Sequence, residues 1–457
     1  LEGRLPMTPG LFPPLLLPAG LTTLFCGLLL VVGRATALSQ VMGYLVAENG
    51  IFLLGIPLMT AGAVWFELTL LLDIFVAVFV MGTSEFMLAG LLPAIATELD
   101  VSVGTAGLLT SAFAVGMVVG APVMAAFARS WPPRLTLIVC LLVFAGSHVI
   151  GAMTPVFSLL LITRVLSALA NAGFLAVALS TATTLVPANQ KGRALSILLS
   201  GTTIATVVGV PAGALLGTAL GWRTTFWAIA ILCIPAAVGV IRGVTNNVGR
   251  SATSATSPRL RAELSQLAMP RLILAMALGA LINGGTFAAF TFLAPVVTET
   301  AGLAEAWVSV ALVMFGIGSF LGVTIAGRLS DQRPGLVLAV GGPLLLTGWI
   351  VLAVVASHPV ALIVLVLVQG FLSFGVGSTL ITRVLYAASG APTMGGSYAT
   401  AALNIGAAAG PVLGAFGLAT GLGLLAPVWV ASVLTAIALA IMLLTGRALT
   451  KTAAEAN

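Results

Sequence analysis

Two charged side chains lie inside long apolar stretches of this chain. Glu85 follows the apolar run that begins at Ile74, and Arg164 interrupts "LLLITRVLSALA". A charge in a hydrocarbon environment costs about 2.5–3.5 kcal/mol on insertion scales, so such a residue usually has a partner or a function. An acid among apolar neighbours can take up and release a proton near neutral pH. We therefore predict that Glu85 binds protons or substrate. The alternative is a structural ion pair or hydrogen bond.

Apolar residues dominate the rest of the chain. Of 457 residues, 60% are hydrophobic and 7% are charged, and the mean hydropathy is +1.20. This composition excludes a water-soluble globular protein and predicts an all-α polytopic membrane protein. A spanning helix needs roughly 20 apolar residues, and about fourteen such stretches are present. The net charge of +6 comes from bases beside apolar runs, without a basic stripe interleaved with aromatic residues, so no nucleic acid partner is expected.

Metal and cofactor chemistry find no support in the sequence. Cys26, Cys140 and Cys233 each lie in an apolar run and lack the spacing of a metal site or a redox pair. The GxxxxGK[ST] pattern of a phosphate-binding loop does not occur. We expect no metal, no cofactor, no obligate protein partner and no enzymatic activity.

Basic residues follow alternate spans. Between Gly82 and Arg447 the chain has twelve apolar spans, and most of its bases follow even-numbered ones: Arg129, Arg134, Lys191, Arg193, Arg242, Arg250, Arg259, Arg261, Arg271, Arg328, Arg333, Arg383, Arg447 and Lys451. Cytoplasmic loops of membrane proteins are rich in lysine and arginine. We therefore expect these loops and both termini to be cytoplasmic, in a bacterial cytoplasmic membrane. Two further predicted spans, about residues 11–32 and 37–62, leave this orientation unchanged because their number is even.

The long polar loop and an internal repeat divide the spans into two bundles of six. The loop contains "GRSATSATSPRLRAELSQ", as expected of a linker. "GVPAGALLG" at 209–217 matches "GAAAGPVLG" at 406–414 at an offset of 197 residues. The predicted divisions are 1–82, 83–243, 244–270 as the linker, 271–447, and 448–457 as a tail. Two such halves predict a carrier that works by alternating access, with its site near the midplane.

Small and polar residues within the spans are candidates for movement and binding. Glycines at four-residue spacing allow close helix packing, and a proline frees a carbonyl; the alternative is ordinary packing of membrane helices. The residues of this kind are Gly209, Pro211, Gly213 and Gly217, repeated by Gly410 and Pro411. Aromatic and amide side chains would suit a pocket for an amphiphilic molecule, although the same groups also cross-link helices or face lipid. The candidates for binding are Phe86, Asn171, Asn283, Phe287, Gln369 and Asn404.

The sequence resembles the major facilitator superfamily. The motifs that carry this resemblance are "GTSEFMLAGLLPAIATELDVSVGTAGLLTSAFAVGMVVGAP", "RVLSALANAGF" and "GVPAGALLG" followed by "GWRTTFW". They are most similar to twelve-helix drug:proton antiporters, and among these to actinobacterial chloramphenicol exporters. The resemblance implies the major facilitator fold, proton-coupled efflux of a small drug, and roles for Glu85 and Arg164 in proton coupling. An interaction between these two residues is a hypothesis, with a static ion pair as the alternative.

Loop motifs extend the resemblance. The sequence from Gly327 to Arg333 resembles the family's loop signature, in which Arg328, Asp331 and Arg333 would latch helix ends on the cytoplasmic side. The equivalent loop of the first half has Arg129 where the family usually has aspartate. His148 and His358 are expected near the outer surface, without a role.

The first 82 residues depart from this pattern. Roughly residues 20–82 resemble membrane component E of hydrogenase-4 complexes, whose embedded carboxylates correspond to Glu48, Glu67 and Asp73. The join falls within one apolar span, about 65–93, which indicates a fused or shifted reading frame. Two other functions stay open: export of sugars or other metabolites, and a non-transporting membrane subunit of a hydrogenase-like complex.

Overall fold

The computed structural model describes residues 22–23, 62–127, 131–185, 200–244, 263, 265–332, 334–391 and 394–450. The described part of the chain contains helices and no strand. Within these described ranges, eleven helices are long and apolar enough to span a membrane, and one bent pair raises the number to twelve. This agrees with the twelve spans predicted from Gly82 onward. The extra spans predicted at 11–32 and 37–62 lie almost wholly outside the described residues.

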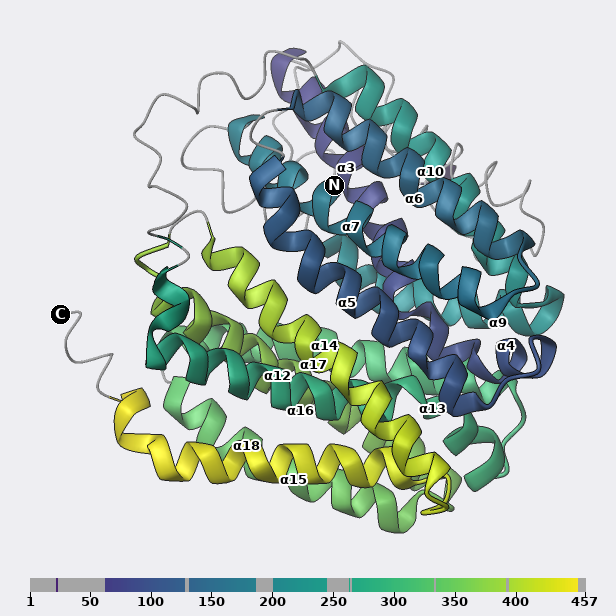
Figure 1. The fold of residues 1–457 in the computed structure, drawn as a ribbon, viewed down its shortest axis with the longest axis vertical. Helices are drawn as coiled ribbons and strands as arrows, with labels where there is room; N and C mark the ends of the chain where they lie inside the picture. Colours follow the sequence, from purple (N-terminus) through teal and green to yellow (C-terminus); the bar gives the residue numbers. More distant parts are fainter. Residues whose placement is uncertain are drawn as a thin grey trace.

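The first six spans contain α3 (Gly62–Phe86), η3 (Met87–Gly90), α4 (Leu92–Glu98), α5 (Val103–Phe127), α6 (Pro133–Met153), α7 (Phe157–Leu185), η5 (Ala205–Gly209), α9 (Val210–Leu220) and α10 (Trp222–Gly243). The last six contain α12 (Pro270–Thr291), α13 (Leu293–Pro295), η8 (Val296–Thr300), α14 (Ala306–Gln332), α15 (Pro334–Val355), α16 (Pro359–Ala387), α17 (Gly395–Ala419) and α18 (Ala426–Thr450). Figure 1 shows these two groups on opposite sides of the molecule.

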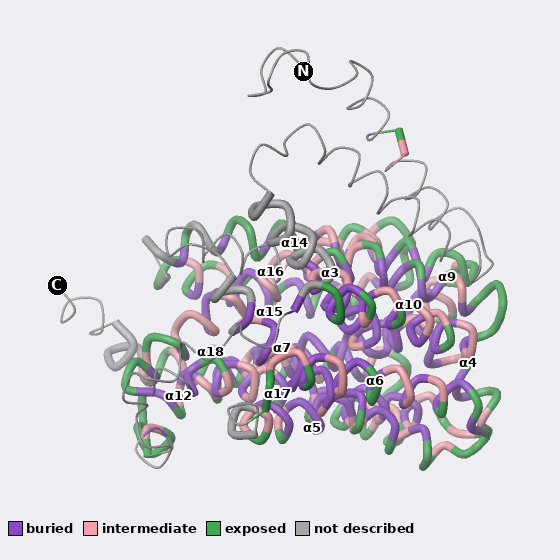
Figure 2. The backbone as a smooth tube through the Cα atoms, turned by 90° about the horizontal axis from the view of Figure 1, so that it is seen from above, coloured by how far each residue is buried: buried purple, intermediate pink, exposed green. Residues whose placement is uncertain are grey.

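Local sequence explains where several helices begin. Pro133, Pro270 and Pro359 each stand in the first turn of a helix, where the missing N–H has no intrahelical partner to lose. Beyond these starts the spans are almost entirely apolar. Helices suit such sequences in lipid because every backbone polar group within a helix is satisfied inside its own segment. Buried residues run through the interior of the helix assembly and exposed residues along its outside (Figure 2).

The glycine motifs pack helices together within each half. A side chain at Gly209 would meet Thr83 on α3, and one at Gly217 would meet Leu91 between η3 and α4, so this face of η5 and α9 packs against the first span. In the second half a side chain at Gly406 would meet the carbonyl of Ala280 on α12. Gly209 and Gly406 are 197 residues apart, and so are Thr83 and Ala280. The sequence repeat is therefore also a repeat of helix contacts.

Two pairs of helices form the boundary between the halves. The first pair is α5 and α17, which meet closely at Gly104 and Ala415. The second is α14 against η5 and α9, where Gly316 lies against the backbone of Thr206 and Val207. The α9 helix thus uses its glycine face inside its own half and another face toward α14. Small residues at both contacts let the backbones approach closely.

The predicted linker returns to the second half at Glu263. Its buried carboxylate accepts a hydrogen bond of 2.8 Å from the backbone N–H of Met394, just before α17. The hydroxyl of Tyr398 donates to the Glu263 carbonyl, also at 2.8 Å. These bonds anchor this part of the linker to the start of α17.

Candidate transport site

A break in the first span positions Glu85. The helical segments Ile74–Gly90 and Leu92–Glu98 are bent by 68° relative to each other. Glu85 lies in the last turn of α3, directly before the 3₁₀ turn η3. The apolar span predicted for about 65–93 is therefore bent, because its helix axis changes direction between Gly90 and Leu92. Discontinuous helices are common at the binding sites of membrane carriers, where they bring charged groups into the bundle interior.

Arg164 lies completely buried in α7 and binds the residue before Glu85. Its Nη1 donates a hydrogen bond of 2.9 Å to the Ser84 hydroxyl, and its Nη2 donates one of 2.9 Å to the Ser84 carbonyl. The guanidinium also lies over the Phe113 ring of α5, 4.5 Å from its centroid, in a cation–π contact. No ion pair within 4.0 Å joins Arg164 to Glu85, although the two charges interact at longer range. The charge of Arg164 is thus met by a serine and an aromatic ring.

His148 completes this polar cluster from α6. Its Nδ1 lies 2.7 Å from the Phe144 carbonyl, which can only accept a hydrogen bond, so Nδ1 carries the proton. In the neutral ring Nε2 is then an acceptor, and the Ser84 hydroxyl donates to it at 2.7 Å. Only 1% of His148 is exposed, so its side chain points into the bundle although it stands near one end of α6. A signal was present in the sequence, because Leu137, Leu141, Phe144 and His148 recur at helical spacing.

Asn171 extends the cluster by two turns of α7. It lies seven residues after Arg164 and therefore on the same face of the helix. Its Nδ2 contacts the Met117 sulfur at 3.7 Å, whereas its buried Oδ1 has no hydrogen-bond partner. Glu85, which is partly exposed, interacts with both Asn171 and Arg164. Four of the groups that could handle a proton or a polar ligand thus gather in the first half: Glu85, His148, Arg164 and Asn171.

An aromatic cluster joins this region to the second half. The Phe86 ring of α3 lies 5.8 Å from Phe287 and 6.3 Å from Phe290 on α12, measured between centroids. Phe290 in turn lies 4.6 Å from Phe315 on α14. Phe86 and Phe287, two of the predicted binding residues, are therefore brought together across the boundary between the halves.

The remaining predicted amides lie elsewhere in the second half. Asn283 donates to the Leu403 carbonyl at 2.7 Å and so cross-links α12 to α17. Asn404 donates to the Thr400 carbonyl of its own helix at 3.0 Å. Gln369 donates to the Leu345 carbonyl at 3.3 Å, and its Oε1 has no partner. The structure therefore does not bring these three amides to the Glu85 cluster.

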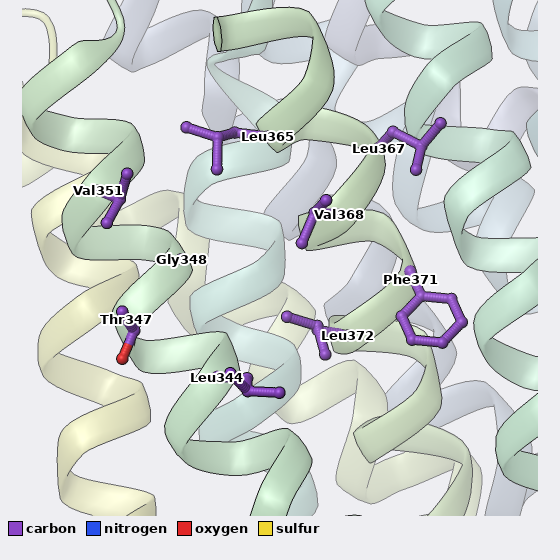
Figure 3. Close-up of a pocket in the computed structure, with 9 residues that line it drawn as sticks. All are labelled: Leu344, Thr347, Gly348, Val351, Leu365, Leu367, Val368, Phe371 and Leu372. Atoms are coloured by element: carbon purple, nitrogen blue, oxygen red, sulfur yellow. The ribbon is translucent and has the colours of Figure 1, made fainter.

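The described part of the second half contains a small cavity and a larger one. A small one of about 20 Å³ is lined by Phe290, Phe315, Gln369 and Trp349, and the Trp349 indole N–H also has no partner. Its volume suits roughly one water molecule. A larger cavity of about 400 Å³ lies between α15 and α16, and its lining is almost entirely apolar (Figure 3). None of the residues that line this larger cavity is a predicted site residue.

Arg223, in the first turn of α10, forms an ion pair of 2.7 Å with Glu98 and donates to the Ala152 and Thr154 carbonyls. It therefore ties together three turns at one end of the first half. The side chains of Arg328, Asp331 and Arg333 lie outside the described residues, as does Arg129.

Two repeated six-helix halves with membrane-length helices and a buried charge cluster beside a helix break define a polytopic membrane carrier. The chain belongs to the Major Facilitator Superfamily, whose family profile matches residues 74–401. It is 64% identical over 365 residues to the "Chloramphenicol resistance protein" of Streptomyces lividans, covering 80% of this chain and 93% of that protein. It is 31% identical over 389 residues to the "Inner membrane transport protein YdhP" of Escherichia coli strain K12, covering 85% and 98%.

Solved structures show the same fold. A bacterial homolog of the human lysosomal transporter Spinster, in an inward-facing and unoccupied conformation, matches with a TM-score of 0.70 at 19% identity. The match covers 86% of this chain and 98% of that structure. The prediction of the major facilitator fold is confirmed.

Proposed function

We propose that this protein exports chloramphenicol or a related phenicol in exchange for protons. The observation that carries the proposal is the 64% identity to the Streptomyces lividans protein over 93% of that protein's length. The arrangement around Glu85 supports the coupling to protons. A carboxyl group that is partly exposed, adjacent to a helix break and close to a buried arginine can change its charge between two conformations.

In the proposed cycle the two halves rock about the boundary formed by α5 with α17 and by α14 with α9. Phe86 and Phe287 would contact the aromatic ring of the drug, and the unpaired Oδ1 of Asn171 would accept a hydrogen bond from one of its polar groups. Drug and proton would occupy the site alternately, with Glu85 ionised when the drug is bound.

The proton gradient supplies enough free energy for this exchange. A charge that enters across 100 mV gains about 2.3 kcal/mol, whereas each tenfold step of accumulation costs about 1.4 kcal/mol. With both termini and the basic loops in the cytoplasm, protons would enter as drug leaves. Arg328, Asp331 and Arg333 would latch the cytoplasmic ends in this scheme, and no covalent chemistry is required.

Accumulation of radiolabelled chloramphenicol in efflux-deficient bacteria tests this function. Cells that express the chain should accumulate less drug than empty cells, and an uncoupler should restore accumulation. Glu85→Gln should restore it as well. Glu305→Gln is the matched control, because Glu305 is an exposed glutamate between η8 and α14. Low accumulation that an uncoupler leaves unchanged would refute proton coupling.

Two alternative functions, export of sugars or other metabolites and a role in a hydrogenase-like complex, can be tested with the same expressing cells. If sugars compete with chloramphenicol for uptake into inverted vesicles, the protein exports a broader class of metabolites. Co-purification with hydrogenase subunits would instead favour a role in a hydrogenase-like complex. The segment that suggested this second alternative lies mostly outside the described residues, and the family match begins at residue 74.

A further inference from the structure

A continuous chain of hydrogen bonds connects three helices of the first half. It runs from the Phe144 carbonyl through His148 and the Ser84 hydroxyl to Arg164, with donor–acceptor distances of 2.7, 2.7 and 2.9 Å. The three side chains come from α6, α3 and α7, and each is at most 1% exposed. Because Arg164 can only donate and the Phe144 carbonyl can only accept, the direction of every bond is fixed when the imidazole is neutral.

The Ser84 hydroxyl departs from the usual behaviour of hydroxyl groups in these helices. Thr83, Ser147 and Ser167 each donate to the backbone carbonyl four residues earlier. This local bond is the common alternative for serine in a helix. Ser84 instead donates to His148 Nε2, which leaves its lone pairs for Arg164. The imidazole thus holds the hydroxyl in the orientation that receives the guanidinium.

This orientation decides where Arg164 is bound. Both of its hydrogen bonds end on Ser84, the residue that precedes Glu85 on α3. The groups that contact the His148 ring are Ser84 from α3, Phe226 from α10 and Phe144 from its own helix. Arg164 from α7 is the charged group that interacts electrostatically with the His148 ring. Glu85 is the next residue after Ser84 on α3. Loss of the imidazole acceptor would let the hydroxyl turn to its own helix and would free Arg164 to approach Glu85.

We propose that His148 is a positioning residue for proton coupling: by orienting the Ser84 hydroxyl, it keeps Arg164 on Ser84 and away from the Glu85 carboxylate. Release of this bond in another conformation lets Arg164 pair with Glu85 and displace its proton. The inference rests on the proposed function, in which Glu85 carries the proton.

A comparison of the two repeated halves supports a functional role for this hydrogen-bond network. The offset of 197 residues, which holds for α3 and α12, puts Leu281 at the position of Ser84. The bounds of α7 and α16 differ by 202 residues, which puts Val366 at the position of Arg164. Both residues are apolar, so the second half folds in the same way without a counterpart of the bond between Ser84 and Arg164. The network is therefore not a requirement of the shared scaffold.

Three variants test the proposal in the full-length protein. His148→Gln retains an acceptor near the position of Nε2, whereas His148→Phe retains the aromatic shape beside Phe144 and Phe226 but removes both nitrogens. Ser84→Ala removes the intermediary. Loss of a buried hydrogen-bond partner predicts that uncoupler-sensitive export falls about tenfold in His148→Phe and in Ser84→Ala. His148→Gln should stay within about threefold of the wild type, since its acceptor restores the bond.

Two readouts separate coupling from general damage. Equilibrium binding of chloramphenicol to purified protein should change little in all three variants, while the pH profile of export flattens in His148→Phe and is restored in His148→Gln. If His148→Phe exports like the wild type, or if His148→Gln is as impaired as His148→Phe, the positioning role is wrong. Either result would leave uncoupler-sensitive export by the wild type, and hence the proposed function, intact.

Nitrogen NMR of ¹⁵N-histidine-labelled protein tests the geometry independently of transport. The chain contains 2 histidines, so His358→Gln assigns the signals of His148. We expect a neutral imidazole with a protonated Nδ1 and an Nε2 resonance that shifts in Ser84→Ala. A protonated Nε2, or a resonance that Ser84→Ala leaves unchanged, would overturn the inference even if export itself proved not to depend on protons.

Discussion

Arg164 donates two hydrogen bonds of 2.9 Å to a single residue, Ser84, through the hydroxyl and the backbone carbonyl. A buried arginine is more often expected to face a carboxylate. Here the neighbouring Glu85 stays partly exposed and free of a direct ion pair with Arg164. The carboxyl group therefore has no direct ion pair with Arg164 in this conformation, and the arginine is bound to the residue before it.

This geometry predicts that Arg164→Lys impairs export. Lysine keeps the charge but lacks the planar fork that binds the hydroxyl and the carbonyl together. We expect uncoupler-sensitive export to fall at least about tenfold, the equivalent of one or two lost charge-assisted hydrogen bonds. Arg271→Lys, at an exposed position in the first turn of α12, is the control. Export by Arg164→Lys at the wild-type rate would show that the charge alone is sufficient.

Drug affinity should depend on pH through Glu85. If proton and drug bind alternately, lower pH weakens drug binding, because by linkage each ligand reduces the affinity for the other to the same degree. Titrations of purified wild-type protein with chloramphenicol should therefore give a higher dissociation constant at pH 6 than at pH 8. In Glu85→Gln the difference should disappear. Equal pH dependence in both proteins would assign the proton to another group.

The aromatic contact between the halves should contribute to drug binding. Phe86→Ala and Phe287→Ala remove rings that lie 5.8 Å apart, and the loss of an aromatic contact of about 1 kcal/mol predicts roughly fivefold weaker binding for each. Phe416→Ala serves as the control, because Phe416 is 69% exposed on the outside of α17. If the control weakens binding as much as the two variants, the effect is not specific to the pocket.

The glycine packing predicts a difference in stability. A side chain at Gly410 would meet the backbone of Gly284 and Ala288 on α12, whereas one at Gly377 in α16 would meet nothing within 4 Å. Overpacking of this kind costs about 1–3 kcal/mol. Gly410→Ala should therefore lower the midpoint of thermal unfolding in detergent, and Gly377→Ala should not. The same midpoint for both variants would contradict the close packing of α17 on α12.

Much of the architecture could be predicted from the sequence, because lipid imposes simple rules. Span length follows from bilayer thickness, and the offset of 197 residues revealed the duplication before any contact was known. The face shared by Arg164 and Asn171 also follows from helical spacing. What the sequence did not reveal is how each helix is rotated against its neighbours. That rotation decides that Arg164 meets Ser84 and that His148 points inward.

Other features that the sequence did not reveal have related causes. His148 stands five residues before the end of α6, so its position along the chain suggested a surface, whereas its position around the helix places it inside. Asn283 and Asn404 have the composition of pocket residues, but backbone carbonyls occupy their amide nitrogens. The bend between Gly90 and Leu92 was hidden because hydropathy reports how apolar a segment is and not the direction of its helix axis.

The second repeat has an apolar residue, Val366, at the position of Arg164, and this has an electrical consequence. A membrane potential exerts force only on charge within the bilayer, and the fully buried charge of Arg164 belongs to the first bundle. With Glu85 ionised the two charges cancel, and with Glu85 protonated the bundle carries one net positive charge. The membrane potential would then exert a force on the first bundle while Glu85 is protonated. While the drug is bound and Glu85 is ionised, the potential would exert no net force on it.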